Sequence, residues 1–233
     1  MAPRVEIDGV AKSFVMHLQG GKLLPVVGNV SLEVAAGECV VLGGPSGAGK
    51  SSILKMIYGN YRVDSGHILV HAADGPVDVA SASPREIIRL RKLSLGYVSQ
   101  FLRAIPRVSA LDLIVASARE QGLDEDKAAS RARSLLQRLN VPERLWSLPP
   151  ATFSGGEQQR VNIARGFVAD HRVLLLDEPT ASLDAVNRAA VVELIFDKKR
   201  QGVAMIGIFH DEDVRERVAD RIVDVTRFAA RAA

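Results

Sequence analysis

One short stretch has the residue types needed to bind a nucleoside triphosphate. Residues 44–51 are Gly-Pro-Ser-Gly-Ala-Gly-Lys-Ser, the complete G-x-x-x-x-G-K-S pattern of a phosphate-binding loop. Its glycines let backbone N–H groups turn toward phosphate oxygens, and the following helix adds the positive end of its dipole. Lys50 is predicted to bridge the β- and γ-phosphates of ATP, and the Ser51 hydroxyl to coordinate Mg²⁺. The predicted nucleotide contacts here are Gly44, Pro45, Ser46, Gly47, Ala48, Gly49, Lys50, Ser51 and Ser52.

An acidic pair follows an apolar segment later in the chain. Val173-Leu174-Leu175-Leu176 is followed directly by Asp177 and Glu178. A carboxylate at the end of a buried strand is costly unless it serves a cation, so Asp177 is predicted to hold Mg²⁺, directly or through water. Glu178 would then face the γ-phosphate and polarise the attacking water as general base. An Asp-Glu pair alone would more simply be a helix-capping turn, but the apolar run and the phosphate-binding loop favour catalysis.

Two polar residues that end other predicted strands are candidates for the same site. Gln100 follows the strand near 95–99, and its amide is predicted to contact the metal-bound water and act as a sensor. His210 follows the apolar run 206–209 and is predicted to contact the γ-phosphate, although a lone histidine is more often structural. The predicted catalytic residues are therefore Glu178, His210 and Gln100, and the predicted metal ligands are Ser51, Gln100 and Asp177.

A second glycine-containing segment has the features of another anion site. Ser154, Gly155, Gly156, Glu157 and Gln158 combine a hydroxyl, two glycines and the start of a helix, which together suit an anion. Because one chain needs a single triphosphate cradle, we expect this segment to close over the nucleotide held by a second copy. The alternative is a simple helix N-cap at Ser154.

Apolar strands and amphipathic helices alternate around these motifs. Residues 5–8 are predicted as an edge strand, 30–34 as another strand, and the apolar run 39–42 as a buried parallel strand. Further strands are predicted near 95–100, 173–176 and 203–209, with helices from about Lys50, Ser154 and Ala185. Residues 109–140 have helical spacing, with Asp124 as an N-cap. The pattern predicts an α/β fold with a mostly parallel core sheet, into which residues 101–153 insert as a helical subdomain.

Composition limits the class of protein. The chain has 233 residues, of which 47% are hydrophobic, so it can bury one sizeable core. Its net charge is +3 and its nearest basic cluster, 85–92, is interrupted by Glu86, so no nucleic-acid partner is predicted. The single cysteine, Cys39, fits a reducing compartment. No apolar stretch approaches the roughly 20 residues that span a bilayer, so we expect a cytoplasmic chain with no direct membrane insertion.

Together these residues resemble the ATP-binding-cassette (ABC) family, and the resemblance covers nearly the whole chain, 1–233, as a single ATP-binding domain. It implies a P-loop NTPase fold of ABC type with an N-terminal antiparallel β region, and ATP and Mg²⁺ as cofactors. It also implies a head-to-tail dimer with a second copy or a related ABC subunit, with ATP between one chain's phosphate-binding loop and the other's signature at 154–158. By the same resemblance Asp184 belongs to the dimer-contact loop 182–184, His210 is the switch histidine, and Phe14 stacks on adenine.

Stretches outside the shared motifs are similar to the L subunit of the bacterial carbon–phosphorus (C–P) lyase system, which degrades phosphonates. They are residues 99–107, 140–146, 162–167 and 209–212. This similarity implies a soluble accessory ATPase with soluble C–P lyase subunits as partners. It would support the synthase stage that forms ribose 1-phosphonate 5-triphosphate.

Two other functions stay open at this point. An ATPase subunit of a membrane transporter, of the lipoprotein-releasing kind or another exporter or importer, shares this architecture. In such proteins the segment 101–109 faces the permease, and here it carries Arg103, Pro106 and Arg107. The other alternative is an interaction module that binds ATP without turnover. The presence of Glu178, Gln100 and His210 argues against it.

Overall fold

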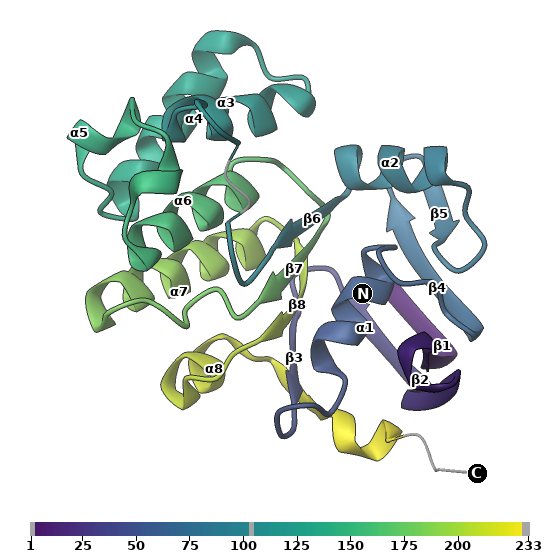
Figure 1. Cartoon of the computed structure of the whole chain (residues 1–233). Helices are drawn as coiled ribbons and strands as arrows, with labels where there is room; N and C mark the ends of the chain where they lie inside the picture. The colour runs from purple at the N-terminus through teal and green to yellow at the C-terminus, as the bar shows by residue number, and fades with distance from the viewer. Residues whose placement is uncertain (1–2, 103–104, 230–233) are drawn as a thin grey trace.

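A five-stranded parallel sheet forms the centre of the protein. The computed structural model describes residues 3–102 and 105–229, and Figure 1 shows the sheet between a group of helices and a second sheet. The strand order is β6-β7-β8-β3-β9, and every neighbouring pair is parallel. The predicted parallel core is therefore confirmed. The strands are β3 (Cys39–Gly43), β6 (Leu95–Val98), β7 (Val173–Asp177), β8 (Ala204–Ile208) and β9 (Arg221–Asp224).

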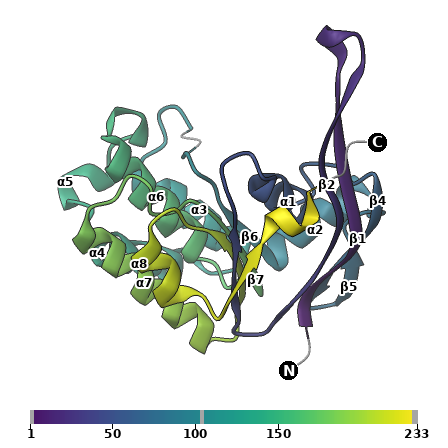
Figure 2. The ribbon, with the colours of Figure 1, turned by 90° about the horizontal axis from the view of Figure 1, so that it is seen from below.

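The second sheet is antiparallel and comes mostly from the N-terminal part of the chain. Its order is β2-β1-β4-β5, with β1 (Pro3–Met16), β2 (Lys22–Ala35), β4 (Ser65–Ala72) and β5 (Gly75–Asp78). The prediction of an edge strand at 5–8 is wrong, because β1 pairs with both β2 and β4. Apolar residues alternating with polar ones show that one face of a strand is buried, and this pattern is the same for edge and central strands. Figure 2 shows the β1–β2 hairpin, closed by the short turn η1 (His17–Gln19), extending beyond the rest of the protein.

Alternating residues of the central strands divide the core into two parts. Val173 and Leu175 face the antiparallel sheet and helix α1 (Lys50–Ile57), whereas Leu174 and Leu176 face the opposite side. That opposite side is covered by α6 (Gly155–Phe167), α7 (Ala185–Arg200) and α8 (Glu212–Val218). Since both faces of the parallel sheet are covered, its inner strands β3, β7 and β8 are continuously apolar up to the functional end of the sheet, whereas the edge strand β9 has one buried residue.

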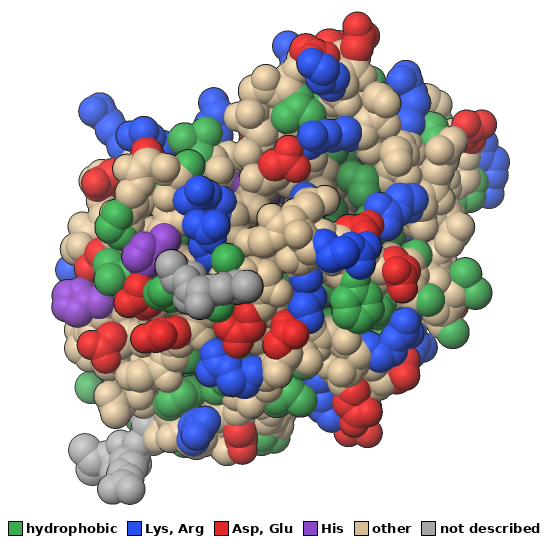
Figure 3. Space-filling view, turned by 180° about the vertical axis from the view of Figure 1, so that it is seen from behind, with side chains coloured by type: hydrophobic (Ala, Val, Ile, Leu, Met, Phe, Trp, Pro, Cys, Tyr) green, Lys and Arg blue, Asp and Glu red, His purple; other side chains and the backbone are tan. Residues whose placement is uncertain are grey.

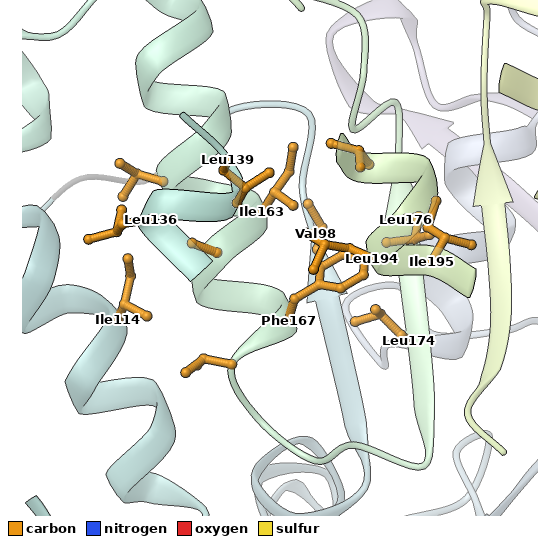
Figure 4. Packing of buried hydrophobic residues seen from close by; sticks show 14 of the residues in the cluster. Val98, Ile114, Leu136, Leu139, Ile163, Phe167, Leu174, Leu176, Leu194 and Ile195 are labelled. Atoms are coloured by element: carbon orange, nitrogen blue, oxygen red, sulfur yellow. The ribbon is translucent and has the colours of Figure 1, made fainter. Parts of the chain in front are cut away.

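Helices of the segment 101–153 pack against α6. They are α3 (Ala110–Glu120), α4 (Glu125–Arg138), α5 (Glu143–Trp146) and the short η2 (Pro150–Thr152). Asp124 caps α4 by accepting a hydrogen bond from the backbone N–H of Lys127, as predicted. Figure 4 shows Ile114, Leu136 and Leu139 directed toward Ile163 of α6. We propose that these helices act as an inserted subdomain bounded by residues 101 and 153.

The remaining elements are α2 (Pro84–Leu93), which precedes β6, and η3 (Val225–Phe228), which follows β9. Within the two described ranges, no helix is both long and apolar enough to cross a bilayer. On the face seen from behind, Figure 3 shows basic and acidic side chains interspersed rather than gathered by sign.

Candidate active site

The phosphate-binding loop connects β3 to α1 at the carboxyl edge of the parallel sheet. Gly44, Gly47 and Gly49 have φ of 122°, 82° and 96°, a region that side chains with a Cβ rarely adopt. A Cβ on Gly49 would also lie 2.7 Å from a methyl group of Val27. Gly49 is the N-cap of α1 and provides no side-chain cap, which leaves the N–H groups of the first turn to bind an anion.

Lys50 lies folded over this loop. Its ammonium donates hydrogen bonds to the carbonyl oxygens of Gly44, at 2.7 Å, and Pro45, at 2.8 Å. Only 9% of the residue is exposed. A lysine ammonium beside the backbone N–H groups of a glycine-rich loop is suited to phosphate, so the loop combines the fixed dipoles and the positive charge that a triphosphate requires.

Asp177 lies beside the first turn of α1. Its Oδ1 accepts a hydrogen bond from the Ser51 hydroxyl at 3.1 Å, and its Oδ2 accepts one from the Tyr97 hydroxyl at 2.6 Å. Burial and the hydrogen bond to Asp177 raise the pKa of Tyr97, so the phenol stays protonated and donates. Mg²⁺ prefers oxygen ligands and binds through one or two carboxylates plus phosphate. The hydroxyl of Ser51 and the 5%-exposed carboxylate of Asp177 fit that preference.

Glu178 is held by both of the other predicted catalytic residues. Gln100 donates from Nε2 to Oε2 of Glu178 at 2.9 Å, and Nε2 of His210 lies 2.7 Å from Oε1. Its backbone N–H donates to the carbonyl of Ile208 at 3.1 Å, and its φ is +53°. A glutamate rarely adopts this left-handed conformation, and such residues concentrate at functional sites. The backbone thus directs the carboxylate to the edge of the sheet where Gln100 and His210 lie.

The segment 154–158 begins α6 and forms a capping box. The Ser154 hydroxyl accepts from the backbone N–H of Glu157 at 3.4 Å, and Oε2 of Glu157 accepts from the backbone N–H of Ser154 at 2.9 Å. The hydrogen bonds from Ser154 lower the pKa of Glu157. Ser154 is therefore a helix N-cap, as the alternative interpretation predicts. Next to it, a Cβ on Gly155 would meet open space. Within the two described ranges, no hydrogen bond links this segment to the phosphate-binding loop, and anion binding by 154–158 stays a prediction.

Asp184 ends the predicted dimer-contact loop and caps α7. It accepts from the backbone N–H of Asn187 at 2.8 Å, and this hydrogen bond lowers the pKa of Asp184. The loop lies close to α6. A Cβ added to Gly156 would lie 3.0 Å from the carbonyl oxygen of Ser182, so a larger residue would crowd the loop there.

Phe14 lies on β1, away from these catalytic groups in the sequence. Its ring is edge-on to Tyr61 with 5.1 Å between centroids, and the Lys12 ammonium lies 5.2 Å from its centroid. Adenine stacking on Phe14 stays a prediction.

In the segment 101–109, which is expected to face a partner, Phe101 is 74% exposed and Arg107 has a φ of +65°. Arg103 lies outside the described residues.

Some functional contacts were not predicted from the sequence. Tyr97, which donates to Asp177, is the main example. Its position in the strand, three residues before Gln100, could have indicated that it lies near the site. Arg188 donates to the Leu183 carbonyl at 3.0 Å and pairs with Asp211 beside His210. Asn187 has no recognisable motif, although polar residues within an apolar helix face are a general indication of a buried network.

The chain has relatives among known ATP-binding proteins. Residues 27–181 match the family profile described as ABC transporter. Over 223 residues the chain is 38% identical to the lipoprotein-releasing system ATP-binding protein LolD of Paramagnetospirillum magneticum, with 95% of each chain covered. It is 34% identical to the macrolide export ATP-binding/permease protein MacB of Marinobacter nauticus, with 97% of this chain but 34% of that protein covered.

A solved structure shares the fold. A dimeric post-hydrolysis state of the ATP-binding cassette MJ0796, bound to ADP and Pi, superimposes with a TM-score of 0.84 and 25% identity, covering 95% of each chain.

Proposed function

Because this chain belongs to the ABC transporter family, we propose that it hydrolyses ATP as one half of a head-to-tail pair of cassettes, and that closure of the pair acts on a partner protein. The observation that carries this proposal is the position of Glu178, held between Gln100 and His210 and directly after Asp177. A binding module without turnover would not need a carboxylate oriented by two polar residues at this place.

Each residue of the site then has a defined task. The N–H groups of 44–52 and the Lys50 ammonium bind and orient the phosphates. Ser51 and Asp177 would hold Mg²⁺, which would supply positive charge to the phosphate oxygens. Glu178 accepts the proton of the attacking water as general base. We expect His210 to leave its contact with Glu178 and to contact a γ-phosphate oxygen when ATP is bound. The orientation of Glu178 would then depend on whether the γ-phosphate is present.

The second cassette supplies the part of the site that one chain lacks. Ser154 and the first turn of α6 present a hydroxyl and N–H groups, which suit a γ-phosphate bound by the partner chain. The dimeric cassette MJ0796 supports this arrangement.

For the partner, the relatives favour a membrane permease. LolD belongs to a lipoprotein-releasing system and MacB is an export protein whose name includes a permease. This chain matches only the ATP-binding third of MacB, so a permease would be a separate chain or segment. Exposed Phe101 and Ile105, at 74% and 53%, provide apolar surface for a docked helix.

A C–P lyase assembly is the second candidate, supported by the similarity at 99–107, 140–146, 162–167 and 209–212. Residues of these stretches are joined in the structure. Asn162 donates to the Ser99 carbonyl at 2.6 Å, and Trp146 donates to the Val141 carbonyl at 2.9 Å. Phe209 is 4% exposed and lies against Gly207. Asn162 and Phe209 thus contact the regions next to Gln100 and His210, whereas Trp146 stabilises the turn after α4.

An affinity capture separates the two candidates. Glu178→Gln protein would be recovered with ATP from native cells grown on a phosphonate, and its partners identified by mass spectrometry. A Lys50→Ala, Glu178→Gln double variant, in which nucleotide binding is weakened, is the control for partners that depend on closure. An integral membrane permease supports the transporter, and soluble C–P lyase subunits support the second candidate. Recovery of neither, together with no ATP hydrolysis by the native protein, would contradict the proposal.

A further inference from the structure

A buried asparagine connects the dimer-contact loop to two other segments. Asn187 lies in the first turn of α7 and is 6% exposed. Its side-chain Nδ2 donates to Oδ2 of Asp184 at 2.9 Å. Its Oδ1 accepts from Nδ2 of Asn140 at 3.0 Å and lies 3.3 Å from Nη1 of Arg160. The Asn187 amide therefore donates to the contact loop and accepts from two other segments of the chain.

The two donors come from the end of α4 and from α6. Asn140 follows α4 with a left-handed φ of +52°, a conformation that asparagine tolerates better than most residues. Its carbonyl accepts from Nη1 of Arg160 at 2.8 Å. Arg160 thus contacts both the backbone carbonyl of Asn140 and the side-chain amide of Asn187, and the Asn187 amide accepts from both Asn140 and Arg160.

Other contacts hold α6 along the same loop. Gln159, 4% exposed, donates to the carbonyl of Pro179 at 3.0 Å, and Gly156 lies against the Ser182 carbonyl. These contacts involve the loop backbone. Among the described residues, Asn187 connects Arg160 to a side chain of the contact loop, because its amide contacts both Arg160 and the carboxylate of Asp184.

We propose that Asn187 is a positioning residue that fixes Asp184, and with it the loop 182–184, relative to Arg160 on the signature helix. The inference rests on the proposed head-to-tail dimer, in which 154–158 and 182–184 of one cassette both meet the other. Hydrogen bonds that share one buried amide, here that of Asn187, orient their members more strictly than isolated hydrogen bonds do. The two surfaces would therefore approach the second cassette as one unit, and losing Asn187 would affect closure more than nucleotide binding.

The substitution Asn187→Ala isolates this role. It keeps the backbone N–H that Asp184 accepts, so the N-cap of α7 remains, and it removes only the side-chain links. In the Glu178→Gln background, we expect the dissociation constant of the ATP-dependent dimer to rise about tenfold, since two or three hydrogen bonds are lost. ATP affinity of the monomer should change by less than about twofold, because the phosphate-binding loop is untouched.

Two further variants distinguish positioning from general destabilisation. Asn140→Gly keeps the left-handed backbone and its carbonyl and removes one link, so a smaller rise is expected. Val191→Ala, at a buried position of α7, destabilises the same helix without touching the network and should leave the dimer constant unchanged. Asn187→Asp keeps the acceptor but sets a second carboxylate against Asp184, and should resemble Asn187→Ala.

The measurements are sedimentation velocity with ATP for the dimer and equilibrium binding of a fluorescent ATP analogue at concentrations where the chain is monomeric. An Asn187→Ala protein that dimerises as tightly as Val191→Ala would overturn the positioning role while leaving the proposed function intact. A Glu178→Gln parent that does not dimerise with ATP would overturn both.

Discussion

Oε1 of Glu178 lies 2.7 Å from Nε2 of His210, although the residues are 32 positions apart. The sheet register explains the contact. β7 and β8 are parallel neighbours with Asp177 opposite Ile208, so the residues that follow each strand emerge at the same edge. The residues proposed as base and switch are brought together by strand order rather than by a loop of special length.

Replacing Glu178 by Gln tests the assignment of the general base. The amide keeps the size of the side chain but cannot accept a proton, so we expect ATP turnover to fall by about 10²–10⁴. ATP binding should persist, and closed dimer should accumulate. Phosphate release and size-exclusion chromatography with ATP measure these effects, with Glu193→Gln on the exposed face of α7 as control. Turnover near the native rate would exclude Glu178 as the base.

Tyr97→Phe tests the support of Asp177. The change removes only the hydroxyl that donates to Oδ2 at 2.6 Å, so the carboxylate loses one of its two orienting contacts. We expect the Mg²⁺ concentration for half-maximal ATPase activity to rise about fivefold, as for loss of about 1 kcal/mol. Saturating Mg²⁺ should restore most of the rate. A titration with an unchanged half-saturation point would show that Ser51 alone holds Asp177 in place.

Two substitutions at Ser154 separate its structural and functional roles. Ser154→Ala removes the cap of α6 and should lower the free energy of unfolding by about 1 kcal/mol. Ser154→Arg should abolish turnover, because a long cation would occupy the space meant for the partner's nucleotide, yet leave ATP binding to the monomer. Urea unfolding and ATPase assays decide between them. If Ser154→Arg protein failed to fold, the cap would be the dominant role.

His171 predicts a pH dependence of stability. Burial lowers its pKa from 6.5 to about 4, with the nearby Lys198 charge acting in the same direction. Its Nδ1 is buried without a hydrogen-bond partner among the described residues. The unfolded chain therefore binds a proton below about pH 6.5 that the folded chain does not. The resulting stability is present above that pH and is lost as pH falls toward about 4.

The matched variant is His171→Phe, which has a planar ring but no titrating group. Between pH 7 and pH 4 its free energy of unfolding should decline less than that of the native chain, by on the order of 2–3 kcal/mol. Urea unfolding across this range measures the difference. Parallel pH profiles for the two proteins would mean that His171 is not the titrating group.

Local patterns account for the parts of the site that the sequence predicted. The phosphate-binding loop, the start of α6 and the buried run before Asp177 each depend on residues close in the chain. Gln100 and His210 were expected at the same site as Glu178, but other contacts between distant segments were not predicted, such as Tyr97 with Asp177 across 80 residues. The polar links of Asn187 depend on where α4 ends and how α6 lies, which only the assembled fold determines.

The antiparallel sheet gives a similar result for the fold. Residues 5–8 were recognised as strand, but the full length of β1 and β2 and the pairing of β4 with β1 were not. The buried residues of Ser65–Ala72 alternate, but the apolar Leu69 lies between Ile68 and Val70 and obscures this alternation in the sequence. α2 was also not predicted, although Ser83 and Glu86 form a capping box at its start and its apolar residues lie on one side of the helix.

The left-handed backbone of Glu178 is conformationally strained. Its φ of +53° costs a residue with a Cβ roughly 1 kcal/mol that glycine would not incur. Glycine would relieve this strain, but it would lose the contacts with Gln100 and His210 and more backbone entropy on folding. The strained backbone of the native residue is therefore offset by the contacts that its carboxylate makes.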